Sequence, residues 1–273
     1  MLTDRISELT SATSAELELE DIFESSLTTI FNDVRNQHGE PGHYVAYASP
    51  KYGEIKLGLA DIEKAQTSLF SHHLWNAGVE VAGMIETGEL NVDGETVLEL
   101  GAGAALPSLL SAISGAKTIV ITDYPAPEIL ANITSNVALN KPKFTSSDIQ
   151  VYGHTWGNLD EEVATKYAHS FTRIIAADTL WMTWEHENLV KSMLHFLDDS
   201  PTSRVVVVAG LHTGRQKMAN FWDVAGESFD IDTIVERDID GIEREYKADR
   251  GIEDVIERKR WLIVGTLKKK SSL

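Results

Sequence analysis

The stretch Thr96–Pro107, which reads TVLELGAGAALP, constrains the fold more than any other part of this chain of 273 residues. Apolar residues run into an acid, two glycines then punctuate a loop of small residues, and Pro107 stands where an apolar run resumes. Gly101 and Gly103 permit positive φ and remove side-chain bulk, and proline is accepted in the first turn of a helix, where its missing N–H has no partner to lose. The pattern predicts a strand, a tight turn that a ligand can approach, and a helix from about Leu106 to Ser114.

The residues around this turn distinguish between two nucleotide-like cofactors. A dinucleotide fingerprint has a third glycine where this chain has Leu106, so that helix and pyrophosphate can approach each other. The acid two residues before the first glycine, Glu99, suits an amine-bearing cation better than a pyrophosphate. The next predicted strand, Thr118–Thr122, runs into Asp123, where a carboxylate can bind ribose hydroxyls. These features point to S-adenosylmethionine.

The composition narrows the class of protein further. A hydrophobic content of 42% in 273 residues suffices for the core of one α/β domain. The absence of cysteine excludes disulfides, thiolate catalysis and cysteine zinc sites. A formal net charge of −18 argues against nucleic acid as a partner, and it either attracts a basic partner or serves solubility alone.

Two observations bear on where the protein acts. Apolar runs fall short of the roughly 20 residues that span a bilayer, which argues against a membrane partner. The N-terminal residues Met1–Glu8 lack the apolar core of a secretory signal. We therefore expect a cytoplasmic protein.

The N-terminal region differs in character from the rest. Residues 1–20 are rich in Ser, Thr and Glu, which predicts a mobile arm, and residues 21–273 are expected to form a single domain. Apolar residues recur at helical spacing over Asp21–Arg35, so this segment either packs on the sheet edge or acts as a lid or substrate guide. Helical spacing also appears over Thr67–Met84, with Trp75 inside it.

Strands and helices alternate from Thr96 to Ala209, which predicts a parallel sheet with helices on both faces. The fold class is therefore α/β, a Rossmann-like seven-stranded and mostly parallel sheet. Ligands of such sheets bind outside the carboxyl ends of the strands. The segments expected at those ends are Gly101–Ala105, Asp123, Trp156 and Ala177–Trp181.

The histidines do not predict a metal site. His72 and His73 are neighbours in the sequence, whereas two ligands from one helix need a spacing that puts them on one face. His186 and His195 also lack that spacing. We expect no bound metal.

Four sequence motifs together resemble a known family. The combination of LELGAGAALP, ITDYP, TWG and AADTLWM, together with HHLW around Trp75, resembles the seven-β-strand methyltransferases of the lysine-methyltransferase-like family 16. Within that family the chain is similar to fungal enzymes of a nicotinamide N-methyltransferase-like group and to protein N-terminal and lysine methyltransferases of elongation factor 1-alpha. The resemblance extends from about Phe23 to Leu267.

The resemblance implies a cofactor site. Trp75 would border S-adenosylmethionine, the glycine turn would pass beneath it, Asp123 would hold the ribose and Trp156 would flank the adenine. Together with Glu99, the cofactor-binding residues expected on this basis are Trp75, Gly101, Ala102, Gly103, Ala104, Ala105, Asp123, Trp156 and Ala177.

The resemblance also implies an acceptor site. Asp178 would orient the acceptor amine, and the faces of Trp75 and Trp181 would stabilise the methylated cation. Family members often carry a tyrosine where this chain has Trp181, which keeps a π-face and lacks the hydroxyl. A lysine with its ordinary pKa of about 10.4 must lose a proton before it can attack, and burial in an aromatic pocket favours that loss.

The predicted function is S-adenosylmethionine-dependent methylation of the N-terminal amine or a nearby lysine of a basic protein segment. The expected substrate is elongation factor 1-alpha, and the enzyme is expected to be a monomer. The alternative is a small-molecule N-methyltransferase that acts on nicotinamide or a similar pyridine. A binding protein that keeps the fold without turnover is a third interpretation.

Overall fold

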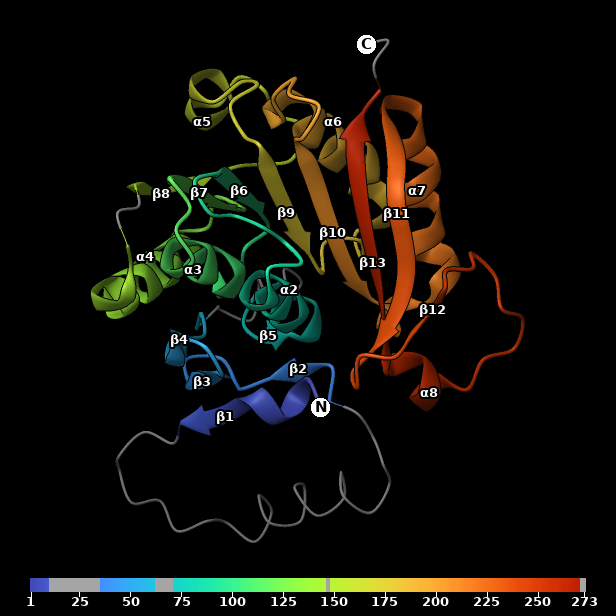
Figure 1. The fold of residues 1–273 in the computed structure, drawn as a ribbon, viewed down its shortest axis with the longest axis horizontal. Coiled ribbons are helices and arrows are strands. Elements are labelled where there is room, and N and C mark those ends of the chain that lie inside the picture. The colour runs from blue at the N-terminus through green and yellow to red at the C-terminus, as the bar shows by residue number, and fades with distance from the viewer. Residues whose placement is uncertain (10–34, 62–70, 146–147, 271–273) are drawn as a thin grey trace, which may run out of the picture.

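A computed structural model of the chain describes residues 1–9, 35–61, 71–145 and 148–270. Its centre is a sheet of eight strands with the order β12-β11-β13-β10-β9-β6-β7-β8 (Figure 1). The strands are β6 (Thr96–Leu100), β7 (Thr118–Asp123), β8 (Asp148–Gly153), β9 (Arg173–Ala177), β10 (Arg204–Gly210), β11 (Phe229–Asp238), β12 (Glu243–Glu245) and β13 (Trp261–Lys269).

The pairing of these strands confirms the predicted fold class. Neighbours among β8, β7, β6, β9 and β10 run parallel, whereas β13 pairs antiparallel with both β10 and β11. The seven predicted strands are all present, but the count of seven is one too low, because β12 adds an edge strand antiparallel to β11. Its three residues, Glu-Arg-Glu, carry no apolar alternation that would have marked a strand.

Helices cover both faces of the sheet because adjacent strand residues point to opposite sides. Val97 of β6 belongs to the core beneath one set of helices, and Leu98 belongs to the core beneath the other. In Figure 1, α2, α3 and α4 lie together on one side of the sheet, and α7 lies on the other. The helices are α2 (Asn76–Thr87), α3 (Leu106–Ile113) and α4 (Pro127–Asn140) on the first face, α5 (Glu162–Lys166), α6 (His186–Phe196) and α7 (Arg215–Ser228) on the second, and α8 (Val255–Lys259) in the β12–β13 connection.

A smaller antiparallel sheet of β1 (Ile6–Leu9), β3 (Tyr44–Ser49) and β4 (Gly53–Gly58) lies beyond the first helix layer. Asparagines of α4 bind its last strand: the Gly58 N–H donates to Asn136 Oδ1 (2.6 Å), and Asn140 Nδ2 donates to the Lys56 carbonyl (2.8 Å). A two-stranded ribbon of β2 (Gln37–His38) and β5 (Leu74–Trp75) completes this end of the molecule.

The start of the chain differs from the predicted mobile arm. The 3-10 helix η1 (Thr3–Arg5) leads into β1, which pairs with β3. Leu2 is buried, and the Arg5 guanidinium donates to the Tyr47 hydroxyl (3.0 Å) and to Glu86 (3.0 Å). These long-range contacts attach residues 1–9 to the core. The rest of the predicted arm, its boundary at residue 20 and the predicted helix up to residue 34 lie outside the described residues.

The predicted helix over Thr67–Met84 begins later than expected. Leu74 and Trp75 are extended in β5, and Trp75 is the N-cap residue of α2, so its side chain projects from a strand end. Residues 67–70 are not among those described. Across the described ranges, no helix combines the length and apolar character needed to cross a bilayer.

Candidate active site

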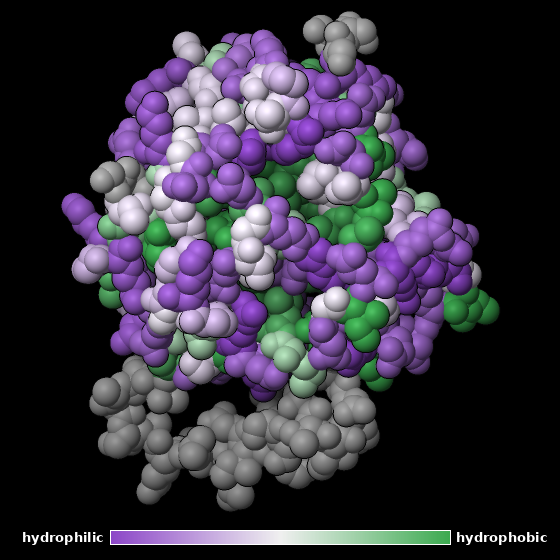
Figure 2. Space-filling model, in the orientation of Figure 1, coloured by the Kyte–Doolittle hydropathy of each residue, from purple (hydrophilic) through white to green (hydrophobic). Residues whose placement is uncertain are grey.

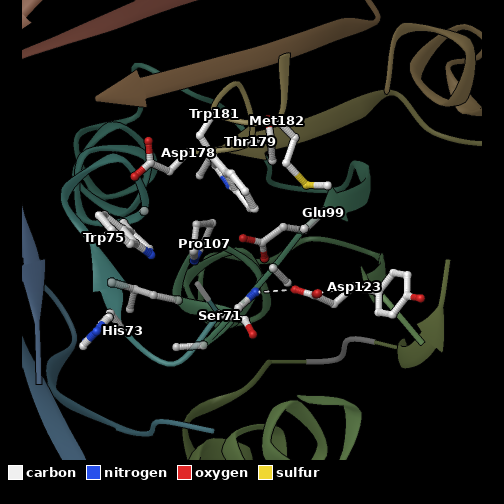
Figure 3. Close-up of a pocket in the computed structure, with 18 of the residues that line it drawn as sticks. Ser71, His73, Trp75, Glu99, Pro107, Asp123, Asp178, Thr179, Trp181 and Met182 are labelled. Atoms are coloured by element: carbon white, nitrogen blue, oxygen red, sulfur yellow. Dashed lines mark hydrogen bonds between the residues drawn. The ribbon is translucent and has the colours of Figure 1, made fainter. Parts of the chain in front are cut away.

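A cavity of about 1040 Å³, including the solvent at its mouth, opens at the carboxyl ends of β6, β7, β8 and β9 (Figure 3). Trp75 and Asp178 lie on one side of it, and Asp123 lies on the opposite side. The Trp181 side chain points into the space between them. This is the position expected for a ligand of a doubly wound sheet. The predicted residues that line it are Trp75, Glu99, Gly101, Ala102, Gly103, Ala104, Asp123, Trp156, Ala177, Asp178 and Trp181.

Ala105 is the one predicted cofactor residue that does not line the cavity. It is fully buried, with φ of 63°, because it is the N-cap of α3: its N–H donates to the Ala102 carbonyl (2.7 Å), and its carbonyl accepts from Leu109 N–H (3.0 Å). The glycine turn therefore reaches the cavity only as far as Ala104. That the other lining residues contact a cofactor stays a prediction.

Gly101 explains why this turn requires glycine. Its φ is 71°, a left-handed conformation that side chains rarely adopt. A Cβ at this position would come within 3.1 Å of both the Thr179 methyl group and the Trp156 ring. Because Gly101 has no side chain, the side chains of Thr179 and Trp156 can pack directly against the backbone of the turn.

Glu99 and Asp123 are buried acids that also hold the turn together. One oxygen of Glu99 accepts from both the backbone N–H (3.0 Å) and the hydroxyl of Ser108 in the first turn of α3. Asp123 accepts from the N–H groups of Gly103 (2.7 Å) and Tyr124 (2.7 Å). Burial raises the pKa of Glu99 to about 8 and that of Asp123 to about 6, although the bonds from Ser108, Gly103 and Tyr124 act in the opposite direction.

Asp178 is held in an unusual conformation at the end of β9. Its φ is 56°, which is costly for a residue with a side chain and is found most often at functional sites. The Gly210 N–H donates to Oδ1 (3.0 Å), and burial raises the pKa of the carboxyl, against the opposing influence of His212 and the Gly210 N–H. A buried acid with a raised pKa is suited to binding an amine and its proton.

Aromatic rings form the walls on either side of this acid. Trp75 stacks on His212 from the 3-10 helix η5 (Leu211–Thr213), with centroids 5.0 Å apart and planes at 18°. Trp181 meets Trp184 of η4 (Thr183–Glu185) edge to face, with centroids 6.4 Å apart. Two of the three indoles that line the cavity, those of Trp75 and Trp181, are therefore each supported from outside it by another ring.

The loop that carries Trp156 is braced by a buried polar network that sequence reasoning did not identify. His154 binds Glu161 through Nδ1 (2.6 Å) and the Ser192 hydroxyl through Nε2 (3.0 Å). That hydroxyl also accepts from Gly157 N–H (2.8 Å). His154 lines the cavity and connects the Trp156 loop to α6.

Two further lining residues were missed, and each carries an unsatisfied hydroxyl. Ser71 is 7% exposed and Thr179 is 2% exposed, and neither hydroxyl has a hydrogen-bond partner among the described residues. Buried hydroxyls are normally paired, so these two are available to a ligand. Serine and threonine are too common for the sequence to have singled them out.

The histidines and acids of the described residues do not gather into a metal site. In the described part of the chain, no group of three or more His, Cys, Asp or Glu side chains could hold a metal ion. His73, adjacent to His72, binds the Gly39 carbonyl through Nδ1 (2.6 Å).

Comparison with known proteins gives a consistent picture. A family model described as lysine methyltransferase matches residues 56–225. The protein N-terminal and lysine N-methyltransferase of Schizosaccharomyces pombe is 36% identical over 190 residues, which are 67% of this chain and 72% of that protein. The proteins of the same name from Aspergillus fumigatus and Gibberella zeae are 40% and 34% identical, over 51% and 62% of this chain and 56% and 70% of their own lengths.

Solved structures are similar in fold. A Streptococcus mutans protein assigned as an S-adenosylmethionine-dependent methyltransferase has a TM-score of 0.58 at 11% identity and aligns with 93% of this chain and 66% of its own. A structure in complex with S-adenosylhomocysteine has a TM-score of 0.57 at 11% identity, with the same shares covered. Identities this low show a shared fold.

Proposed function

The chain belongs to the lysine methyltransferase family, and from this premise we propose that it methylates amines of a protein substrate with S-adenosylmethionine as donor. The acceptor would be the N-terminal amine, a nearby lysine, or both. The observation that carries this proposal is the position of Asp178, a buried acid flanked by Trp75 and Trp181 at the carboxyl ends of the strands.

The walls of the cavity fit this cofactor. Gly101 and Gly103 line the cavity as bare backbone, and the Ser71 and Thr179 hydroxyls lack partners within the described ranges. Asp123 would bind the ribose, and the Trp156 ring would pack on the adenine. When bound, S-adenosylmethionine supplies a methyl group on a positively charged sulfur.

On the acceptor side, Asp178 would receive the amine. The Gly210 N–H occupies Oδ1, which leaves Oδ2 to accept a hydrogen bond from the amine and to fix the direction of its lone pair. The raised pKa of this carboxyl makes it a stronger base than an exposed aspartate, so it can also hold the proton that an ammonium loses. Trp75 and Trp181 would stabilise the methylated cation through their faces, each by about 0.5–2 kcal/mol. Positioning supplies most of the rate enhancement.

The substrate we propose is a basic segment of elongation factor 1-alpha. A net charge of −18 favours the approach of a basic chain, and relatives at 34–40% identity are named for N-terminal and lysine methylation of proteins. This proposal places the enzyme in the cytoplasm, where it would act as a monomer.

The test is to incubate the purified protein with methyl-labelled S-adenosylmethionine and a cytosolic extract that lacks this enzyme. We expect one labelled protein of the size of elongation factor 1-alpha, with the methylated residue identified by mass spectrometry. The Asp178→Asn variant is the matched control and should leave that band nearly unlabelled. Label confined to small molecules would contradict the proposal in favour of a pyridine acceptor, and absence of label despite cofactor binding would indicate a binding protein.

A further inference from the structure

Trp184 is a large aromatic side chain in an unusual place. It is 69% exposed, although the other tryptophans in the described structure are buried or half-buried. Its ring lies at 89° to the ring of Trp181, with the centroids 6.4 Å apart, and the Trp181 side chain lines the cavity. An exposed tryptophan at the mouth of a cavity offers a π-face to whatever enters it, because a large indole is seldom left in water without a partner.

The next residue in the chain, Glu185, is a half-buried carboxylate that lines the cavity. Its Oε2 accepts from Asn188 Nδ2 (2.8 Å), and no lysine or arginine of the described chain forms an ion pair with it. This differs from other half-buried acids, such as Glu95, which pairs with Arg173 at 2.9 Å. Trp184 and Glu185 thus place a π-face and an unpaired negative charge next to each other at the cavity mouth.

We propose that Trp184 and Glu185 form an outer cation site that binds a second lysine of the substrate while the acceptor amine lies at Asp178. The inference rests on the proposed function and names a feature of its substrate: a lysine close to the amine that is methylated. An ammonium ion is attracted both to an indole face and to a carboxylate, and its methylene stem packs on the ring.

The spacing of the two tryptophans indicates how close that lysine is. The ring centroids of Trp181 and Trp184 are 6.4 Å apart. An extended peptide advances about 3.3 Å per residue, so this distance corresponds to about two residues. The lysine held at the outer site should therefore lie within about one to three residues of the acceptor.

The test uses peptides with a free N-terminal amine and a single lysine moved through positions 2 to 5 of a Gly, Ala and Ser background. Each is compared with the same peptide carrying norleucine, which keeps the methylene stem and lacks the charge. For the wild-type enzyme we expect lysine at the best position to raise kcat/KM for N-terminal methylation about 3- to 10-fold, mostly through a lower KM.

Three variants locate the effect. Trp184→Ala should reduce the lysine-to-norleucine ratio to about 1, Trp184→Phe should retain part of it, and Glu185→Gln should reduce it about 2- to 5-fold. Glu187→Gln is the control for charge, because Glu187 is exposed on the same segment and lies outside the cavity lining, and it should keep the wild-type ratio. An unchanged melting temperature shows that Trp184→Ala is folded.

The outcomes separate this inference from the proposed function. If the wild-type enzyme methylates both peptides and their ratio stays near 1 at every position, the outer site is refuted and the proposed function stands. A ratio that survives in Trp184→Ala also refutes it. If S-adenosylmethionine binds but no peptide or protein is methylated, the proposed function fails first, and the outer site fails with it.

Discussion

Two regions of this molecule bury carboxylates, and they differ in whether those carboxylates are paired with guanidinium groups. Beneath α7, Glu236 is fully buried and paired with three guanidinium groups, those of Arg215, Arg244 (2.7 Å) and Arg250 (3.1 Å). At the carboxyl ends of the strands, Glu99, Asp123 and Asp178 are buried without an ion pair to any described lysine or arginine. The face of the molecule that Figure 2 shows is mostly hydrophilic, with hydrophobic residues visible near its centre.

The pKa values show what this difference means. Burial alone would raise the pKa of Glu236, but the hydrogen bonds from Arg215, the Lys247 amide and Arg244 lower it overall. The three cavity acids accept hydrogen bonds from backbone N–H groups but have no guanidinium partner among the described residues, and burial raises the pKa of each. A buried acid that is fully paired fixes the structure, whereas one left unpaired costs stability and keeps its affinity for a proton or a cationic ligand.

The largest effect should come from breaking the paired cluster. Arg215→Met removes the guanidinium that binds both Glu236 and Glu253, which leaves the fully buried Glu236 with two of its three guanidinium partners and deprives the half-buried Glu253 of its pair at 2.7 Å. We expect the free energy of unfolding in urea to fall by about 3–5 kcal/mol. Lys56→Met is the control, because its pair with Glu54 is about half exposed and should contribute less than about 1 kcal/mol. An equal loss of free energy of unfolding in the two variants would show that the buried cluster stabilises the fold no more than an exposed ion pair does.

The second largest effect is expected from a substitution of Asp178, which should lower the catalytic rate without lowering the free energy of unfolding. Asp178→Asn keeps the shape of the side chain and removes the charge that orients the amine. We expect kcat/KM to fall about 100-fold, equivalent to about 2.7 kcal/mol, because misplacing the attacking atom is costly. The free energy of unfolding should stay the same or rise, since an unpaired buried carboxylate is lost. Retained activity would remove Asp178 from the mechanism.

A third prediction uses the pH dependence of folding. The pKa of Glu99 is about 8 in the folded protein and close to its ordinary value of 4.5 when unfolded, so between these values the folded protein holds a proton that the unfolded chain has released. The contribution of Glu99 to stability is therefore fully present below about pH 4.5 and is lost as the pH rises toward about 8. Asp123, with a folded pKa of about 6, acts in the same direction at lower pH.

Glu99→Gln should remove this dependence while keeping an oxygen that can accept from Ser108. Between about pH 6 and about pH 8 we expect the wild-type free energy of unfolding to fall by about 2 kcal/mol more than that of the variant. Urea titrations at the two pH values measure the difference. Parallel loss in both proteins would mean that Glu99 is ionised across this range.

The smallest effect concerns an unpaired hydroxyl. Thr179→Val keeps the shape of the side chain and removes the hydroxyl that lacks a partner among the described residues. We expect the ligand-free protein to become more stable by about 1 kcal/mol and the affinity for S-adenosylmethionine to weaken about 5- to 10-fold. Calorimetry of unfolding and of binding measures both, and Ser71→Ala should behave in the same way. A loss of stability in Thr179→Val would show that the hydroxyl is already paired.

The sequence was informative wherever a feature is local. The strand, turn and helix over Thr96–Pro107 could be predicted from glycine, proline and the apolar pattern, and so could the acids at the ends of β7 and β9. The sequence did not show that Ala105 lies outside the cavity lining, because a run of small residues does not reveal which of them becomes the N-cap of α3. The three residues of β12 and the docking of residues 1–9 on β3 carried no local signal either.

By itself, the sequence determined the class of the fold, the alternation of strands and helices along the chain and the edge of the sheet where the site was expected, because period, turn chemistry and strand ends are properties of neighbouring residues. Only the tertiary structure decided that His212 supports Trp75, and that the Ser71 and Thr179 hydroxyls face the cavity without partners among the described residues. It also decided that Glu236 has guanidinium partners and that Asp178 has none within the same ranges. These are relations between residues far apart in the chain. Whether a buried charge stabilises the fold or remains available to a ligand depends on which distant groups the fold brings beside it.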